Sequence, residues 1–91
     1  MLVTISRDAA RALRVSTPLA YQYSAIAAAI KGGQLSDGRW RFSLTPDDAI
    51  HLRAWCEEVQ ADALRRANAA VAALFDGIAA DITAALNANR A

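Results

Sequence analysis

From Thr45 onward the sequence is typical of one continuous helix, and a helix of that length does not fit inside a domain of this size. Thr45 is a helix-capping residue, Pro46 suits the first helical position, and apolar residues then recur every three or four positions. About 43 helical residues would extend about 64 Å, whereas a folded chain of this length has an expected radius of gyration of about 12 Å. The segment must therefore bend, protrude or pack against a partner.

The apolar stripe of this segment gives a first indication of its neighbour. From Leu52 to Ala85 its mean spacing is about 3.7 residues, wider than the roughly 3.5 residues of a left-handed coiled coil, so no ordinary heptad coiled coil is expected. Asn68 and Asp76-Gly77 are candidate bends, and Asp76-Gly77 is favoured because glycine costs about 1 kcal/mol inside a helix. Two outcomes stay open: association with another chain, which we favour, or a fold-back near Asp76-Gly77.

Residues 1–45 contain two further helix signals. Ser6 is a capping residue for a helix that runs to about Val15. Thr17-Pro18 starts a second helix, because proline suits the first helical position, and Gly32-Gly33 ends it. We therefore expect two helices before residue 34.

A short β-structure is predicted after the second helix. Asp37-Gly38 is a tight-turn dipeptide, and the residues that follow alternate between apolar and polar, as in a strand with one solvent-exposed face. This strand is expected to pair with residues 34–36 as a hairpin, to which residues 2–5 can add a third strand. The chain is thus predicted to be a single domain, residues 1–91, mainly α with a small antiparallel β-hairpin (α+β). Residues 1–45 form its basic half, and residues 46–91 form the long or bent C-terminal helix.

The core must come from few large residues, because alanine is the commonest residue and buries little area. The expected core residues are Leu13, Leu19, Ile26, Ile30, Trp40, Phe42, Leu44, Leu52, Val59, Leu74, Ile78 and Ile82.

The sign of the net charge changes near Thr45, where the long helical segment is predicted to begin. Residues 1–45 carry six basic and two acidic side chains, whereas residues 46–91 carry four basic and seven acidic ones. The whole chain has a net charge of only +1, too small to indicate nucleic-acid or membrane binding from totals alone. The opposite signs of the halves permit head-to-tail self-association, or contact of the basic half with an acidic partner.

No pattern in the chain indicates catalysis, a cofactor or a metal site. His51 is the sole histidine and Cys56 the sole cysteine, so neither a thiolate metal cage nor an intramolecular disulfide can form. We therefore expect no enzyme activity and no cofactor. No uninterrupted apolar run opens the chain, and Asp76 and Asp81 would be costly at bilayer depth. A cytoplasmic location without membrane association is expected.

The preferred functional hypothesis is a non-catalytic interaction module that binds a larger protein partner, as an accessory or inhibitory protein, and forms a homo-oligomer. The alanine-rich helix offers surface that needs a neighbour, and Trp55 beside its stripe is of a residue type enriched at interface hot spots. Leu74 is expected in the same helix–helix interface. The residues expected to contact an acidic or phosphate-bearing partner are Arg7, Arg11, Arg14, Arg39 and Arg41.

The alternative is a small DNA-binding regulator. AARALRVS at residues 9–16, the helix that ends at residues 31–33, and GRWRF at residues 38–42 together resemble excisionase-type winged helix-turn-helix proteins. The resemblance covers about half the chain and implies a first helix, a recognition helix and a wing strand. The second helix here is longer than in that family, and residues 19–30 contain no lysine or arginine, so phosphate attraction falls to arginines elsewhere. The DNA contacts expected under this alternative are Arg11, Tyr21, Gln22, Ser24, Arg39 and Arg41.

Overall fold

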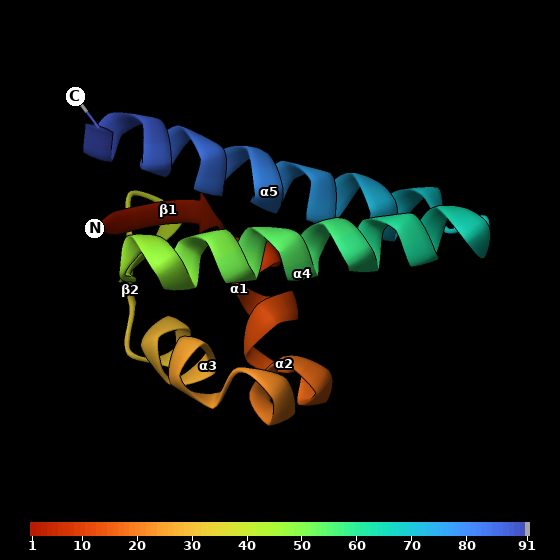
Figure 1. The fold of residues 1–91 in the computed structure, drawn as a ribbon, viewed down its shortest axis with the longest axis horizontal. Coiled ribbons are helices and arrows are strands. Elements are labelled where there is room, and N and C mark those ends of the chain that lie inside the picture. The colour runs from red at the N-terminus through yellow and green to blue at the C-terminus, as the bar shows by residue number, and fades with distance from the viewer. Residues whose placement is uncertain (91) are drawn as a thin grey trace.

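The computed structural model describes residues 1–90 and confirms the α+β class. In chain order the elements are β1 (Leu2–Ser6), α1 (Arg7–Arg14), α2 (Thr17–Gln22), α3 (Ser24–Lys31), β2 (Gln34–Ser36), β3 (Arg39–Ser43), α4 (Pro46–Arg65) and α5 (Ala69–Arg90). Figure 1 shows α4 and α5 side by side, with β1 along them and α2 and α3 on the side of α4 away from α5. The radius of gyration is 12.3 Å, so the long C-terminal segment does not protrude as one rod.

The C-terminal half folds back on itself at residues 66–68. Ala67 adopts a left-handed conformation with φ of 57°. Its N–H donates to the carbonyl of Leu64 (3.1 Å), and the N–H of Asn68 donates to that of Ala63 (2.8 Å), the pairing of a Schellman motif. The Oδ1 of Asn68 then accepts from the N–H of Val71 at 3.2 Å and caps α5. These bonds satisfy backbone groups at both helix ends.

The bend favoured at Asp76-Gly77 is therefore wrong. The helix α5 runs unbroken through both residues, and the weaker candidate beside Asn68 is the site of the reversal. A single exposed glycine destabilises a helix only through its low helix propensity, and the packing of α5 outweighs this free-energy cost. At Asn68 a side-chain cap is available, and this is what makes the reversal favourable there.

The apolar stripes of α4 and α5 face each other across the hairpin. Trp55 of α4 is 7% exposed, and its ring meets Phe75 of α5 edge to face, with centroids 5.8 Å apart. Polar contacts flank the stripe, from Gln60 Nε2 to Asp76 Oδ1 and from Arg53 Nη1 to the hydroxyl of Thr83, both at 3.3 Å. The stripe thus finds a neighbour within its own chain, while association with another chain stays a prediction.

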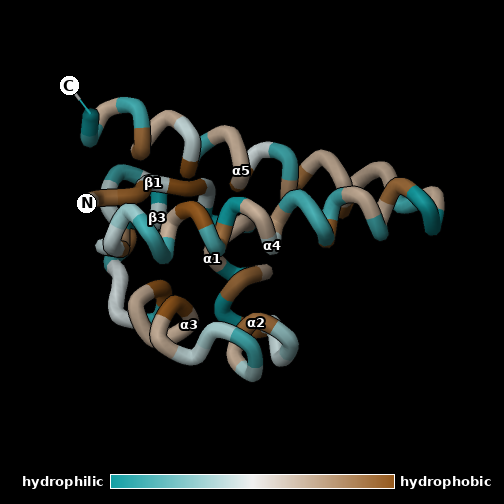
Figure 2. Tube along the Cα trace, in the orientation of Figure 1, coloured by the Kyte–Doolittle hydropathy of each residue, from teal (hydrophilic) through white to brown (hydrophobic). Residues whose placement is uncertain are grey.

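The helix α5 is apolar over most of its length, and many of its exposed positions are alanine. Figure 2 shows brown tones along most of α5, whereas α4 alternates between teal and brown. Within residues 1–90, α5 alone is long and apolar enough to cross a membrane by length and composition. Its most apolar window has a mean hydropathy of 1.7 and is 28% buried. A helix that packs in a soluble core passes the same test, so this finding gives only weak support to a membrane segment.

The second predicted helix is two helices. Tyr23 has φ of −135° and ψ of 65°, outside the helical region, and separates α2 from α3. Its ring stacks on His51 of α4 with centroids 6.2 Å apart. The single helix expected from residue 17 to residue 32 is therefore wrong. The change of direction at Tyr23 lets Leu19 and Ile26 both reach the core, which the uninterrupted periodicity of the sequence concealed.

The predicted hairpin is part of a three-stranded antiparallel sheet in the order β1-β3-β2. The register pairs Val3 with Phe42 and Ile5 with Trp40. Directly paired residues point to the same face, so these four side chains face the core, and the two arginines of β3 lie on the other face. The expected third strand is confirmed.

The core is continuous from the sheet to the helical hairpin. Of the expected core residues, Trp40, Val59 and Leu74 are half-buried and the others are buried. Large buried residues outside the expected set are Val3, Ile5, Trp55 and Phe75. Residues from β1, α1, α3, α4 and α5 share one cluster, so both halves of the chain belong to one packed unit.

Gly77→Ala is expected to stabilise the protein by about 1 kcal/mol, because alanine has the higher helix propensity and nothing lies within 4 Å of the added Cβ. Urea unfolding followed by far-UV circular dichroism measures the change. Gly33→Ala is the control with the opposite sign, since its Cβ would lie 2.5 Å from Trp40 Nε1 and 2.6 Å from the carbonyl oxygen of Arg41. A loss of stability in Gly77→Ala contradicts a continuous α5.

Candidate functional site

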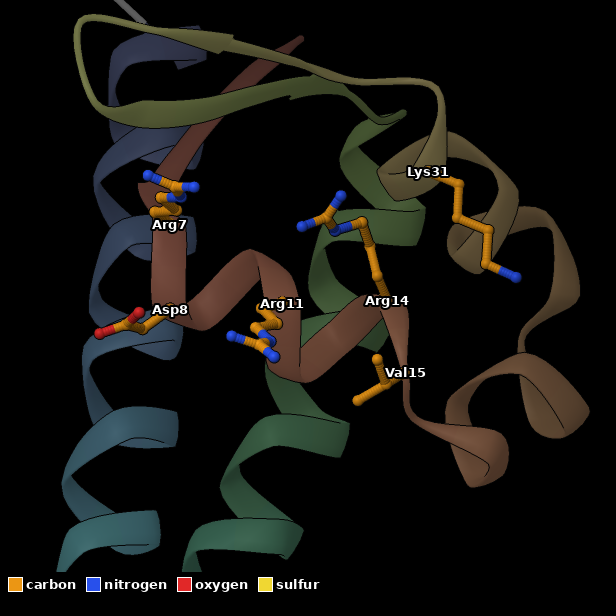
Figure 3. Close-up of a pocket in the computed structure, with 6 residues that line it drawn as sticks. All are labelled: Arg7, Asp8, Arg11, Arg14, Val15 and Lys31. Atoms are coloured by element: carbon orange, nitrogen blue, oxygen red, sulfur yellow. The ribbon is translucent and has the colours of Figure 1, made fainter.

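A hollow of about 710 Å³ lies along α1 and is lined mainly by basic side chains. Figure 3 shows the lining residues as sticks, with Asp8 on one side of the arginines and Lys31 on the other. Four of the six side chains are cationic and one is anionic, so the hollow is suited to an anion. The lining residues are Arg7, Asp8, Arg11, Arg14, Val15 and Lys31.

The helix α1 places its three arginines on one face, as their spacing predicts. The hydroxyl of Ser6 accepts from the N–H of Ala9 at 3.0 Å and fixes the start of the helix. Arg7, Arg11 and Arg14 then follow at i, i+4 and i+7 and project outward, while the opposite face is buried. Arg11 and Arg14 also complement the negative end of the helix dipole, which favours them on structural grounds alone.

Trp40 joins the elements that surround the hollow. Its indole N–H donates to the carbonyl of Ile30, at the end of α3, over 2.8 Å. The guanidinium carbon of Arg14 lies 4.4 Å from the centroid of the Trp40 ring, a cation–π contact. Trp40 of β3 therefore contacts both Arg14 on α1 and the end of α3 that carries Lys31, and it fixes their relative positions. Stacking engages the face of the guanidinium, and the N–H donors that bind phosphate lie in its plane.

Arg39 lies outside the hollow, on the strand that pairs with β1 up to the start of α1. In the β1–β3 register it is paired with Ser6, the residue before Arg7. Its Nη2 donates to Asp81 Oδ2 of α5 and to the carbonyl oxygen of Thr4, both at 3.3 Å. We call Arg7, Arg11, Arg14, Lys31 and Arg39 together the basic surface.

Arg41 lies apart from the basic surface. It lines a second hollow, of about 530 Å³, formed by parts of β1, β2 and β3 and the end of α3. It is paired with Thr4 on one side and Gln34 on the other. Of the five arginines predicted as partner contacts, the hollow brings together Arg7, Arg11 and Arg14. Arg39 is linked to them by the pairing of its backbone with Ser6, and Arg41 lines the second hollow.

The predicted base-contacting residues form a separate exposed group at the junction of α2 and α3. Tyr21 is 90% exposed, and Gln22 and Ser24 are exposed beside it in the chain. None of the three lines the basic hollow. Tyr21 and Gln22 end α2, and Ser24 begins α3.

Trp55 and Leu74 lie in a helix–helix interface, and that interface is inside the chain. Trp55 is buried against Phe75, and Leu74 is half-buried against the core. Contact between Trp55 and a partner protein would therefore require the α4–α5 hairpin to open.

Lys31 is the functional candidate that sequence reasoning did not identify. Its only local signal is its place as the basic residue in the last turn of α3. That signal indicates a favourable interaction with the helix dipole. The contact between α1 and α3 that brings Lys31 to the hollow is tertiary and leaves no local pattern.

The only cysteine is protected from reaction. Cys56 is buried on α4, and burial, with a smaller contribution from the charge of Glu57, raises the pKa of its thiol to about 12. The thiolate is the reactive form of cysteine, and it is scarce at neutral pH here. Within residues 1–90, no group of three or more His, Cys, Asp or Glu side chains is placed to hold a metal ion.

Cys56 is expected to resist a disulfide reagent such as DTNB at pH 8 in the folded protein, because the thiol is buried and protonated. Labelling should reach one thiol per chain only after addition of guanidinium chloride, as followed by absorbance at 412 nm. Complete labelling within minutes in native buffer would contradict this burial.

Comparison with protein-family models, curated proteins and solved structures finds no match to this chain. The function of the protein must therefore be argued from its geometry and charge.

Proposed function

We propose that this protein binds double-stranded DNA through the basic surface. The observation that carries the proposal is the hollow along α1, lined by four cationic side chains and one anionic one. Attraction between such side chains and phosphates supplies most of the affinity of non-specific DNA binding. Three of the four cations are arginines, whose planar donors suit phosphate oxygens.

The order of the elements supports a duplex as the ligand. The helix α1 is followed by a turn at residues 15–16, by α2 and α3, and then by the β2–β3 hairpin. This is the sequence of elements expected of a helix-turn-helix with a wing. Tyr21 and Gln22 of α2 and Ser24 at the start of α3 are exposed and are available to the edges of bases. Residues 19–30 contain no lysine or arginine, so we expect phosphate contacts to dominate over base readout.

The partner-protein hypothesis keeps one specific observation in its favour. The most apolar window of α5 is only 28% buried within the chain, and its exposed positions include Ala73, Gly77, Ala80 and Ala84. Self-association through this face is our second candidate. Size-exclusion chromatography with light scattering tests it: a dimer at tens of micromolar supports it, and a monomer contradicts it.

A non-catalytic role and a cytoplasmic location form part of the proposal. The buried, protonated thiol of Cys56 suits a reducing compartment but does not require one. No cofactor is needed for the function proposed.

A mixed-sequence duplex of about 20 base pairs is expected to bind with steep salt dependence. Four phosphate contacts, each contributing about −0.9 to the slope of log K against log salt, give a slope of about −3.6 and a loss of about 150-fold from 50 to 200 mM salt. Fluorescence anisotropy of the labelled duplex measures both quantities. Absence of binding at 50 mM salt contradicts the proposal.

The double variant Arg7→Ala, Arg11→Ala removes two of these contacts and should reduce the slope by about 2. It spares Arg14, which stacks on Trp40. The matched control is Arg65→Ala, Arg66→Ala, which removes the same charge where both arginines pair with Asp62 at the far end of α4. Equal losses in the two double variants would show that net charge, and not the basic surface, is responsible.

A further inference from the structure

One residue of the basic surface is held by the C-terminal hairpin. The Arg39–Asp81 contact joins β3 to α5 over 42 residues of sequence, at 3.3 Å. The two side chains are 48% and 37% exposed, so solvent reaches the ion pair, and a phosphate group approaching the surface can reach it too.

Packing, and not local charge, sets the position of Asp81. Its neighbour Ile82 is fully buried, as is Ile78 one turn earlier, and α5 packs along β1. The carboxylate of Asp81 is thereby fixed beside the sheet, within reach of Arg39. The contact exists because the hairpin docks on the N-terminal half.

Arg39 is also placed to serve the same ligand as α1. Its pairing with Ser6 puts its backbone one residue from Arg7, and directly opposite residues in an antiparallel pair lie about 5 Å apart. The backbone of Arg39 therefore lies close to Arg7, and the length of the arginine side chain lets Arg39 turn from Asp81 to a phosphate bound there. Carboxylate and phosphate oxygens accept from the same guanidinium donors, so both cannot engage those donors fully at once.

We propose that Asp81 competes with DNA phosphate for Arg39, so that α5 restrains DNA binding by residues 1–44. This inference rests on the proposed DNA-binding function. An exposed ion pair contributes little to stability, so replacement of Asp81 by a phosphate at Arg39 costs little free energy. The carboxylate therefore lowers the affinity for DNA without abolishing binding. Release of Arg39 adds one phosphate contact to those made by α1 and Lys31.

The chain offers a matched control on the same helix. Asp76 is the other acidic residue of α5, and its Oδ1 accepts from Gln60 Nε2 of α4 at 3.3 Å. Asp81→Asn and Asp76→Asn each remove one negative charge from α5, but only Asp81→Asn removes a carboxylate from Arg39. Comparison of the two separates competition for Arg39 from a general change in net charge.

The test measures the dissociation constant of a labelled mixed-sequence duplex at several salt concentrations for the wild type and both variants. Asp81→Asn should bind about 3- to 10-fold more tightly at 50 mM salt, with a slope steeper by about 0.9. Asp76→Asn should change affinity by less than about twofold, because a distant exposed charge is screened. Asp81→Ala should follow Asp81→Asn, which checks that the new amide is not responsible. Thermal unfolding confirms that each variant is folded.

The last comparison is between Arg39→Ala and the double variant Arg39→Ala, Asp81→Asn. In an Arg39→Ala background, Asp81→Asn should no longer tighten DNA binding, because the guanidinium for which Asp81 and phosphate compete is absent. The inference is overturned if Asp81→Asn binds like the wild type, if it gains no more than Asp76→Asn, or if its gain persists without Arg39. Wild-type binding with no effect at Asp81 overturns this inference alone, whereas no binding by any of the proteins overturns the proposed function with it.

Discussion

The packing of α5 against α4 and β1 is the contact on which the rest of the structure depends. As one straight helix, the segment from residue 46 to residue 90 would be too long for a compact domain of this size. The reversal at Ala67 divides its apolar stripe into two stripes, one on α4 and one on α5, that pack against each other. The same packing brings Ile78 and Ile82 into one cluster with Val3 and Ile5 of the first strand. The N-terminal module and the C-terminal hairpin therefore share a core, and loss of the hairpin would expose the residues beneath the sheet.

The strand β3 connects this core to the charged surface. Trp40 and Phe42 face inward, and Arg39 and Arg41 face outward, because side chains alternate along a strand. Trp40 fixes the end of α3 by a hydrogen bond and supports Arg14 of α1 by stacking. The position of the cationic side chains is thus a consequence of core packing, and it does not depend on a bound ligand.

Local chemistry explains which elements could be predicted from the sequence. The hydroxyls of Ser6 and Thr45 cap α1 and α4 as expected, and Asp37-Gly38 forms the turn between β2 and β3. The sequence ranks the reversal beside Asn68 below Asp76-Gly77, because the left-handed residue of the reversal is Ala67, which lacks the signature of a glycine cap. The break at Tyr23 was hidden because the apolar period continues across it. The three arginines of α1 could be assigned to one face, whereas contacts made by tertiary packing, such as Arg39 with Asp81, have no local signal.

Chemical-shift mapping tests most directly whether the basic surface binds DNA. The measurement is a titration of the ¹⁵N-labelled protein with a short mixed-sequence duplex at low salt, followed by ¹H–¹⁵N correlation spectra. The account predicts that perturbed amides cluster in α1, at the end of α3 around Lys31 and at the start of β3 around Arg39. The exposed positions at the start of α5, such as Ala70 and Ala73, should stay unchanged. Perturbations confined to α5, or none at a duplex excess, would contradict it.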